Sequence, residues 1–125
     1  MATDKEDPTA SPDTVSSLSL DTVLELLANQ RRRFVLYTLI DTSSNGIDLQ
    51  TLIEDVATLE AARVNEALTR DRYLAVGSDL YHWHLPVLAD VGVVETDTRS
   101  GSVRYWRSDL LETWATRVRQ DELPR

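Results

Sequence analysis

The chain of 125 residues contains no cysteine, only one lysine and only four glycines. The lack of cysteine excludes disulfides, iron–sulfur clusters and zinc sites built on thiolates. The sequence also lacks a run of eighteen apolar residues and an N-terminal segment of signal-peptide type. We therefore expect a soluble, cytoplasmic protein with no membrane contact, and its length predicts a single compact core.

The scarcity of lysine stands beside an excess of acid. Twelve arginines and one lysine oppose 21 acidic residues, which gives a net charge of −8. An acidic, aspartate-rich and lysine-poor surface suits a protein that must stay hydrated in concentrated salt, where long-range repulsion is screened. The composition therefore predicts a salt-adapted cell. An ordinary acidic protein is the alternative, which fits the near absence of lysine less well.

The shortage of glycine bears on catalysis. The four glycines fall where turns, caps or helix breaks are expected, so none remains for a loop that binds phosphate. The sequence has no G-x-S-x-G nucleophile motif and no dinucleotide-binding motif. We therefore expect no enzymatic activity, no catalytic residues and no cofactor.

The two histidines of the chain, His82 and His84, raise the question of a metal site. Residues two apart on an α-helix point about 200° away from each other, so the two imidazoles would diverge. No cysteine and no Glu-x-x-His pattern supplies further ligands. We expect no metal site, a buried His84 with a ring nitrogen bonded to the backbone, and a more exposed His82.

Apolar spacing and turn residues predict a mainly helical α+β protein with a small β-hairpin. Residues 1–17, rich in proline, serine, threonine and acid, read as a disordered acidic leader. The domain is expected over residues 18–107, and an amphipathic helix capped by Ser108 over 108–125. The expected helices span 20–29, 30–41, 50–60, 61–76 and 78–91, and the expected strands span 47–49, 93–97 and 102–106.

The segment 78–91 is the most distinctive of these elements. Tyr81, His84, Leu85 and Leu88 recur at i, i+3, i+4 and i+7, which predicts a buried stripe. The opposite side then carries Asp79, His82, Trp83, Pro86 and Asp90. A helix followed directly by a hairpin is typical of a winged helix-turn-helix, in which the helix enters the major groove and the hairpin is the wing.

Several stretches resemble known winged-helix proteins. "LLANQRRRFVLYTLID" looks like the first helix of ArsR-type regulators, "GIDLQTLIEDVA" resembles their strand and second helix, and "HLPVLADVGVVETDTRSGSVRYW" resembles their recognition helix and wing. The acidic composition and "LYHWHLPVLADVGVVE" are similar to a family of small winged-helix domains of halophilic archaea, mostly of unknown function. The resemblance covers about residues 18–106 and implies a regulator of transcription that binds double-stranded DNA.

The candidate DNA contacts lie on the outer face of the helix, on the wing and just ahead of the helix. Arginine donates two hydrogen bonds to guanine or phosphate, and a tryptophan can pack on sugar or on a thymine methyl. The candidates are His82, Trp83, Arg99, Ser100, Arg104, Arg63, Arg70 and Arg72. Asp79, near the expected start of the helix, would repel phosphate unless it accepts a hydrogen bond from the amino group of a cytosine.

The three consecutive arginines Arg31, Arg32 and Arg33 cover most of the circumference of a helix, so they cannot all face DNA. We expect structural pairing instead, with one arginine over the apolar core and another bound to Asp21 or Glu25.

A protein-interaction module on the same scaffold is the alternative function, because net acidity weakens binding to DNA and exposed tryptophans suit protein interfaces. A positive surface on the helix and wing favours DNA, and an apolar or negative one favours a protein. The terminal helix either closes the core or forms a homodimer, in which Leu110, Leu111, Trp114 and Val118 would meet Leu20, Val23 and Leu27 of another subunit.

Overall fold

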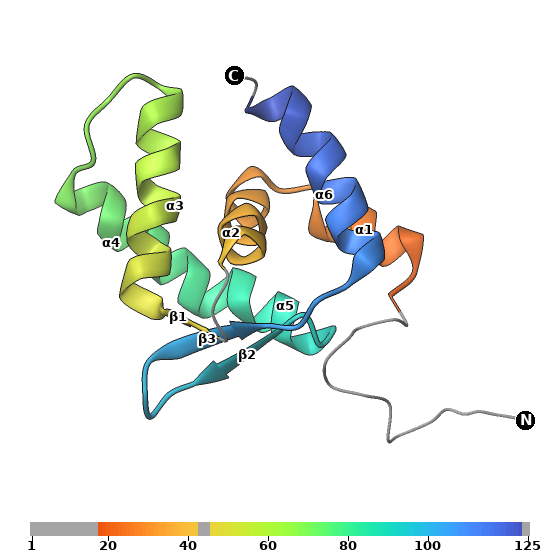
Figure 1. Ribbon diagram of the computed structural model, residues 1–125. Coiled ribbons are helices and arrows are strands. Elements are labelled where there is room, and N and C mark those ends of the chain that lie inside the picture. The colour runs from red at the N-terminus through yellow and green to blue at the C-terminus, as the bar shows by residue number, and fades with distance from the viewer. Residues whose placement is uncertain (1–17, 43–45, 124–125) are drawn as a thin grey trace, which may run out of the picture.

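The computed structural model describes residues 18–42 and 46–123, so the expected leader over 1–17 lies outside the described residues. As predicted, the fold is α+β, mainly helical with a small antiparallel sheet (Figure 1). A π-helical turn over Leu80–His84 joins α4 to α5. The elements are α1 (Leu20–Leu26), α2 (Gln30–Asp41), β1 (Ile47–Asp48), α3 (Leu49–Arg63), α4 (Arg70–Asp79), α5 (Leu85–Asp90), β2 (Val94–Asp97), β3 (Ser102–Tyr105) and α6 (Asp109–Glu122).

Polar side chains begin the helices. The Ser19 hydroxyl accepts a hydrogen bond from the Thr22 amide at 3.1 Å, and the Ser108 hydroxyl accepts one from the Leu111 amide at 3.2 Å. Asn29 accepts in the same way at the start of α2. Such caps satisfy amide groups that have no partner within the helix. The predicted cap at Ser108 is confirmed.

The centre of the core is α2, which lies between α3 and α6 (Figure 1). Phe34, Leu36, Tyr37 and Leu39 on this helix are almost completely buried. Apolar side chains of α3, of the helix over residues 70–90 and of the sheet cover the other sides of α2. These buried side chains form one continuous hydrophobic core, as expected for a chain of this length.

The sheet has the strand order β1-β3-β2. Val103 of β3 pairs with Ile47 of β1 and with Thr96 of β2, and its side chain is fully buried. Gly101, with a φ of +72°, stands in the turn between β2 and β3, as the sequence predicted for the hairpin.

The predicted helix over 61–76 is wrong, because α3 ends at Arg63 and α4 starts at Arg70. Asn65 adopts a left-handed φ of +58°, and the Glu66 amide donates to the Ala61 carbonyl at 2.8 Å. These features form the C-terminal stop called a Schellman motif, in which asparagine is a common substitute for glycine.

The sequence predicted that Gly77 and Ser78 break or bend the helix, but the helix contains no break there. The start at residue 78 that was predicted for the helix over 78–91 is therefore too late. The chain is helical without interruption from Arg70 to Asp90. A Cβ at Gly77 would lie 3.3 Å from Cδ1 of Ile53. Gly77 thus allows α4 to approach α3 closely, and it breaks no helix.

Tyr81 was expected in the buried stripe, but its exposed fraction is 56%. The π-helical turn adds about one residue to that turn of the helix and rotates the residues after it. The fully buried positions are instead Val76, Leu80, His84 and Leu88, which are spaced four apart. The predictions for His84, Leu85 and Leu88 as buried residues are confirmed.

The terminal helix α6 packs against α1 and α2 of its own chain. Leu111 and Ala115 are its buried residues, whereas Leu110 is 37% exposed. Val23 and Leu27 of α1 are buried in the same core. The sequence left two roles open for this helix, closure of the core or a dimer contact. Because Val23, Leu27 and Leu111 are buried in the core, these three cannot form the dimer contact. In the part of the chain that the structure describes, no helix is long and apolar enough to span a membrane.

Candidate nucleic-acid interface

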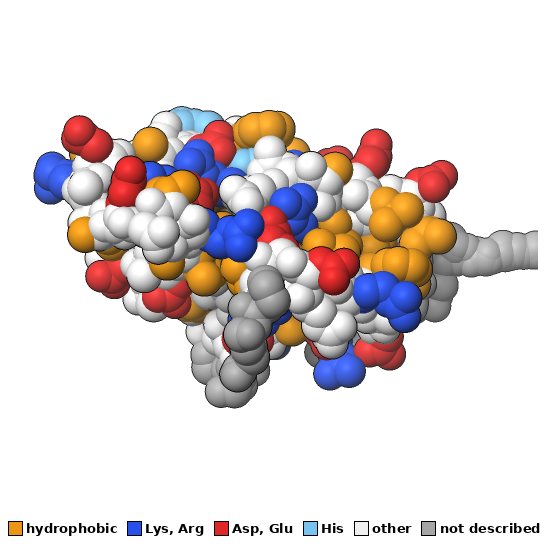
Figure 2. All heavy atoms as spheres, turned by 90° about the horizontal axis from the view of Figure 1, so that it is seen from above, with side chains coloured by type: hydrophobic (Ala, Val, Ile, Leu, Met, Phe, Trp, Pro, Cys, Tyr) orange, Lys and Arg blue, Asp and Glu red, His pale blue; other side chains and the backbone are white. Residues whose placement is uncertain are grey.

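The exposed residues of the helix Arg70–Asp90 and of the hairpin β2–β3 form one candidate surface, called here the helix–hairpin surface. The start of α4 and the tip of the hairpin lie at the same end of the molecule, and β2 follows α5 at the other end (Figure 1). Histidine and hydrophobic side chains of this region appear along the upper edge of Figure 2. Leu74, Tyr81 and Trp83 are its large exposed hydrophobic residues.

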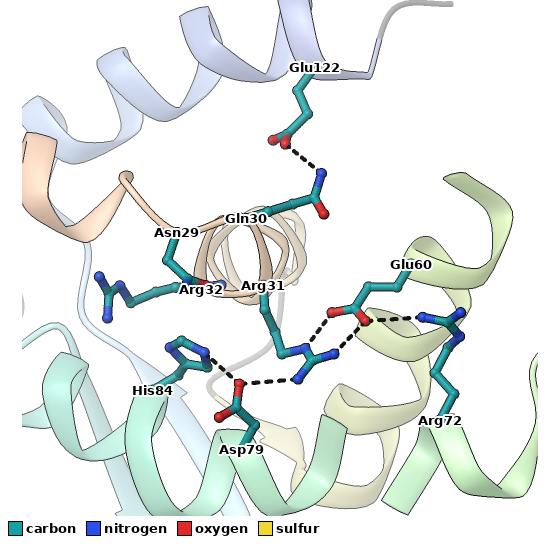
Figure 3. A network of polar contacts seen from close by, with 9 residues as sticks. All are labelled: Asn29, Gln30, Arg31, Arg32, Glu60, Arg72, Asp79, His84 and Glu122. Atoms are coloured by element: carbon teal, nitrogen blue, oxygen red, sulfur yellow. Dashed lines mark hydrogen bonds and ion pairs between the residues drawn. The ribbon is translucent and has the colours of Figure 1, made fainter. Parts of the chain in front are cut away.

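Asp79, which was expected to repel phosphate, is turned towards the protein (Figure 3). Its Oδ2 accepts hydrogen bonds from Nη1 of Arg31 at 3.1 Å and from Nε2 of His84 at 2.9 Å. No other acidic residue occurs between Arg72 and Ala89. The middle of the helix therefore offers an outer face almost free of negative charge, in a protein that is strongly acidic overall.

Asp79 belongs to a network that joins three helices (Figure 3). Nη2 of Arg31 in α2 donates to Oε1 of Glu60 in α3 at 2.8 Å, while its Nη1 binds Asp79 in α4. Arg72 of α4 adds contacts to Glu60 at 3.4 Å and to Glu66 at 3.1 Å. Ion pairs that are partly shielded from water orient the groups they join. The network thus sets the position of α4 on α2 and α3.

His84 is fully buried at the end of this network. Burial lowers the pKa of its imidazole, against the opposing effect of the Asp79 carboxylate. The sequence predicted a ring nitrogen bonded to backbone, but Nε2 binds the Asp79 carboxylate instead. The Nδ1 atom has no hydrogen-bond partner among the described residues. Within those residues no group of three histidine or acidic side chains could hold a metal ion.

The three consecutive arginines are all structural, as predicted, but their partners differ from those expected. Arg31 binds Glu60 and Asp79, and Arg33 binds Glu122 at 2.6 Å. The guanidinium of Arg32 donates to the backbone carbonyls of Leu26 and Glu25 at 2.9 and 3.0 Å. The Asp21 and Glu25 carboxylates form no ion pair with these arginines, because Arg31 is turned towards α3 and α4, Arg33 towards α6, and Arg32 towards the backbone at the end of α1. The charge of Glu25 only opposes the lowering of the pKa of Arg32 by burial.

The arginines predicted to contact DNA fall into two groups. Arg63 donates to the backbone carbonyl of Glu122, and Arg72 binds Glu60 and Glu66, so both are engaged within the protein. Arg70, Arg99 and Arg104 are exposed and form no ion pair with the described residues. The structure therefore leaves one free cation at the start of α4 and two on the hairpin.

The hairpin carries both signs of charge. The Asp97 carboxylate accepts from the backbone amides of Arg99 at 2.9 Å and Ser100 at 3.4 Å, which lowers its pKa and orders the tip. Glu95 stands opposite Arg104 in the register of β2 and β3. Two carboxylates thus accompany the two arginines of the hairpin.

Trp106 is a residue of the helix–hairpin surface that was not among the candidates predicted from the sequence. The guanidinium of Arg104 lies 4.1 Å from the centre of the Trp106 ring, a cation–π contact that leaves the N–H edges of the arginine accessible. In a β-strand, residues i and i+2 lie on the same face. The spacing of Arg104 and Trp106 could therefore have predicted that their side chains lie side by side.

Trp83 and His82 are both exposed, as expected, the former by 48%. The Trp83 ring stacks on His84 with 4.4 Å between the ring centres, and the His82 ring meets Tyr81 edge-on at 5.1 Å. The helix–hairpin surface therefore combines aromatic groups with polar groups, and its free arginines lie at the edges.

These elements define an α+β domain with an exposed helix and an antiparallel hairpin beside it. Residues 24–104 match the family model described as Domain of unknown function (DUF7344), and the chain belongs to that family. The matched range runs from α1 to β3 and leaves α6 outside it. The comparison with curated proteins and the comparison with solved structures gave no match.

Proposed function

We propose that this protein is a transcription regulator that binds double-stranded DNA through a winged helix-turn-helix related to the ArsR type. In this proposal the helix Arg70–Asp90 enters the major groove and the hairpin is the wing. The protein acts in the cytoplasm of a salt-adapted archaeal cell, without catalysis and without a cofactor.

One observation carries the proposal. Among the described residues, three of the four exposed arginines without an ion pair or a side-chain hydrogen bond, Arg70, Arg99 and Arg104, belong to the helix–hairpin surface, and the fourth, Arg117, lies on α6. The only carboxylate in the middle of the helix of this surface is turned inward. Most of the other described arginines form ion pairs with the protein's own carboxylates, and Arg32 donates to backbone carbonyls. Phosphate groups can therefore approach this surface and find cations at its edges.

The net charge of −8 is compatible with the proposal in concentrated salt. The release of counterions, which drives most proteins onto DNA in dilute buffer, contributes little when the bulk salt is already concentrated. Repulsion from distant acids is screened for the same reason. A few free arginines and close contacts in the groove then suffice for binding.

The test is the selection of bound duplexes from a random pool in near-molar potassium chloride, followed by titrations over a range of salt. The double variant Arg99→Ala/Arg104→Ala should bind the enriched duplex more weakly. The slope of log affinity against log salt should also fall by about two, since each lost phosphate contact lowers it by about one.

A matched control removes the same charge elsewhere. Arg107 and Arg117 are exposed and lie outside the hairpin; Arg107 pairs with Asp109 at 2.9 Å, whereas Arg117 stacks on Trp114 as Arg104 stacks on Trp106. The variants Arg117→Ala and Arg107→Ala/Arg117→Ala should both retain the slope of the unmodified protein. The absence of any enriched duplex would contradict the proposal. Equal slopes for the two double variants would exclude the hairpin as a contact with DNA.

The apolar middle of the helix favours a second candidate, a module that binds another protein. Leu74 is 50% exposed and Tyr81 is 56% exposed, and exposed apolar and aromatic groups of this kind are common at protein interfaces. Two results together would support this function: no duplex is enriched from the random pool, and the Tyr81→Ser variant no longer binds a protein partner that the unmodified protein binds.

A homodimer is part of the primary proposal, because two copies can bind two half-sites of a duplex. Hydrophobic side chains gather over α1 and α6 at the right of Figure 2. Those exposed there are Leu20 (46%), Leu24 (45%) and Leu110 (37%). These leucines, rather than the buried Val23, Leu27 and Leu111, form the proposed contact.

A further inference from the structure

The helix of the proposed DNA site has an unusual composition. From Tyr73 to Ala89 the sequence contains no arginine, lysine, asparagine, glutamine or glutamate. Its one carboxylate, Asp79, is held by Arg31 and His84. The exposed residues on this part of α4 and on the π-helical turn are Leu74, Ala75, Ser78, Tyr81, His82 and Trp83.

This composition restricts how bases can be recognised. In the major groove guanine is bound by arginine or lysine, adenine by asparagine or glutamine, and cytosine by glutamate or aspartate. None of these side chains is available on the middle of the helix. Thymine alone presents a methyl group in the groove, and apolar side chains contact that group.

The geometry suits this contact. Leu74, Ser78 and Tyr81 follow the spacing i, i+4 and i+7, which places them along one side of the helix. Leu74 and Tyr81 are each at least half exposed, so both have apolar surface that a methyl group can cover. Ser78 lies between them and can bond to any base edge.

We propose that the helix recognises thymine methyl groups in the major groove through apolar contacts of Leu74, Ala75 and Tyr81. This inference rests on the proposed function and names the base that the site selects. Arg70, Arg99 and Arg104 then position the duplex by its phosphates. Apolar contacts are not screened by salt, so this form of recognition persists where ion pairs weaken.

Replacement of thymine by uracil tests the inference directly, because it removes the methyl group and keeps the hydrogen-bonding edge. The duplex enriched from the random pool is synthesised with either thymine or uracil in the sequence that the enriched duplexes share. Both duplexes are then titrated with the protein in near-molar potassium chloride. Affinity should fall about fourfold for each methyl that loses its contact, and so about sixteenfold for two.

Substitution of the protein gives the second arm. Leu74→Ser should weaken binding to the thymine duplex and reduce the ratio of the two affinities, and Tyr81→Ser should do the same. The matched control is Val64→Ser, which alters a residue of similar exposure (54%) in the connection between α3 and α4. That variant should keep the ratio of the unmodified protein.

The outcomes separate the two proposals. If a duplex is enriched but binds equally well with thymine and uracil, the thymine inference is overturned and DNA binding stands. An unchanged ratio in both Leu74→Ser and Tyr81→Ser would likewise overturn the assignment of these residues. If no duplex is enriched, the proposed function fails and the inference fails with it.

Discussion

Glu122 in the last turn of α6 provides the sharpest test of how the terminal helix is held. Its carboxylate accepts from Nε and Nη2 of Arg33 at 2.8 and 2.6 Å, from the Tyr37 hydroxyl at 2.8 Å and from Gln30 at 3.2 Å. Only 9% of its side chain is exposed. The hydrogen bonds from Arg33 are the main reason that the pKa of Glu122 falls from 4.5 to about 2.

The substitution Glu122→Gln retains the shape of the side chain and removes its charge. The difference between a pKa of 4.5 and one of about 2 corresponds to about 3 kcal/mol at about 1.4 kcal/mol per pKa unit. The free energy of unfolding at pH 7 should therefore be lower in the variant by about this amount. Urea denaturation followed by circular dichroism measures it at constant salt.

The dependence on pH has a definite sign. Because folding lowers the pKa of Glu122, its contribution to stability is complete above pH 4.5 and declines as the pH falls towards about 2. The difference in unfolding free energy between the two proteins should therefore shrink over the same range. Other carboxyl groups titrate there as well, so the difference between the proteins is the quantity to compare.

The neighbouring Asp121→Asn provides the matched control, because Asp121 is exposed. Its effect should stay within about 0.5 kcal/mol, as is usual for surface positions. A loss below about 0.5 kcal/mol in Glu122→Gln, or a loss that does not change with pH, would refute the role given to this carboxylate.

Two further predictions concern the turn after α3 and the oligomeric state. Asn65 has a φ of +58°, so Asn65→Ala should lower the free energy of unfolding by about 1 kcal/mol while Asn65→Gly should not lower it; equal stability of the alanine and glycine variants in urea would contradict this. Light scattering in concentrated salt should give twice the chain mass of 14.1 kDa for the unmodified protein and the single mass for Leu24→Asp. A single mass for the unmodified protein at every concentration would exclude the dimer.

Local patterns in the sequence were sufficient for much of the fold. Ser108 predicted the start of α6, and Gly101 predicted the hairpin turn, because a cap and a positive φ each depend on a few adjacent residues. The stop at Asn65 was equally local, since asparagine is common at that position of a helix end. It was missed because the helix-forming residues on both sides suggested one continuous helix.

The candidate site was less predictable. Eight side chains were predicted from the sequence to contact DNA. Two of them, Arg63 and Arg72, instead form hydrogen bonds or ion pairs within the protein. Nothing in the sequence distinguishes these arginines from Arg70 and Arg99. Their partners lie on other helices, so only packing could separate paired arginines from free ones.

The sequence by itself determined the kinds of element in this protein, its single core, the burial of His84 and the exposure of Trp83, because these follow from spacing and polarity along a short segment. The tertiary structure alone decided the π-helical turn that exposes Tyr81 and the inward rotation of Asp79. The Asp79 contact depends on Arg31, 48 residues away in the chain. Such a contact forms only when packing brings distant helices together, and no local pattern encodes it.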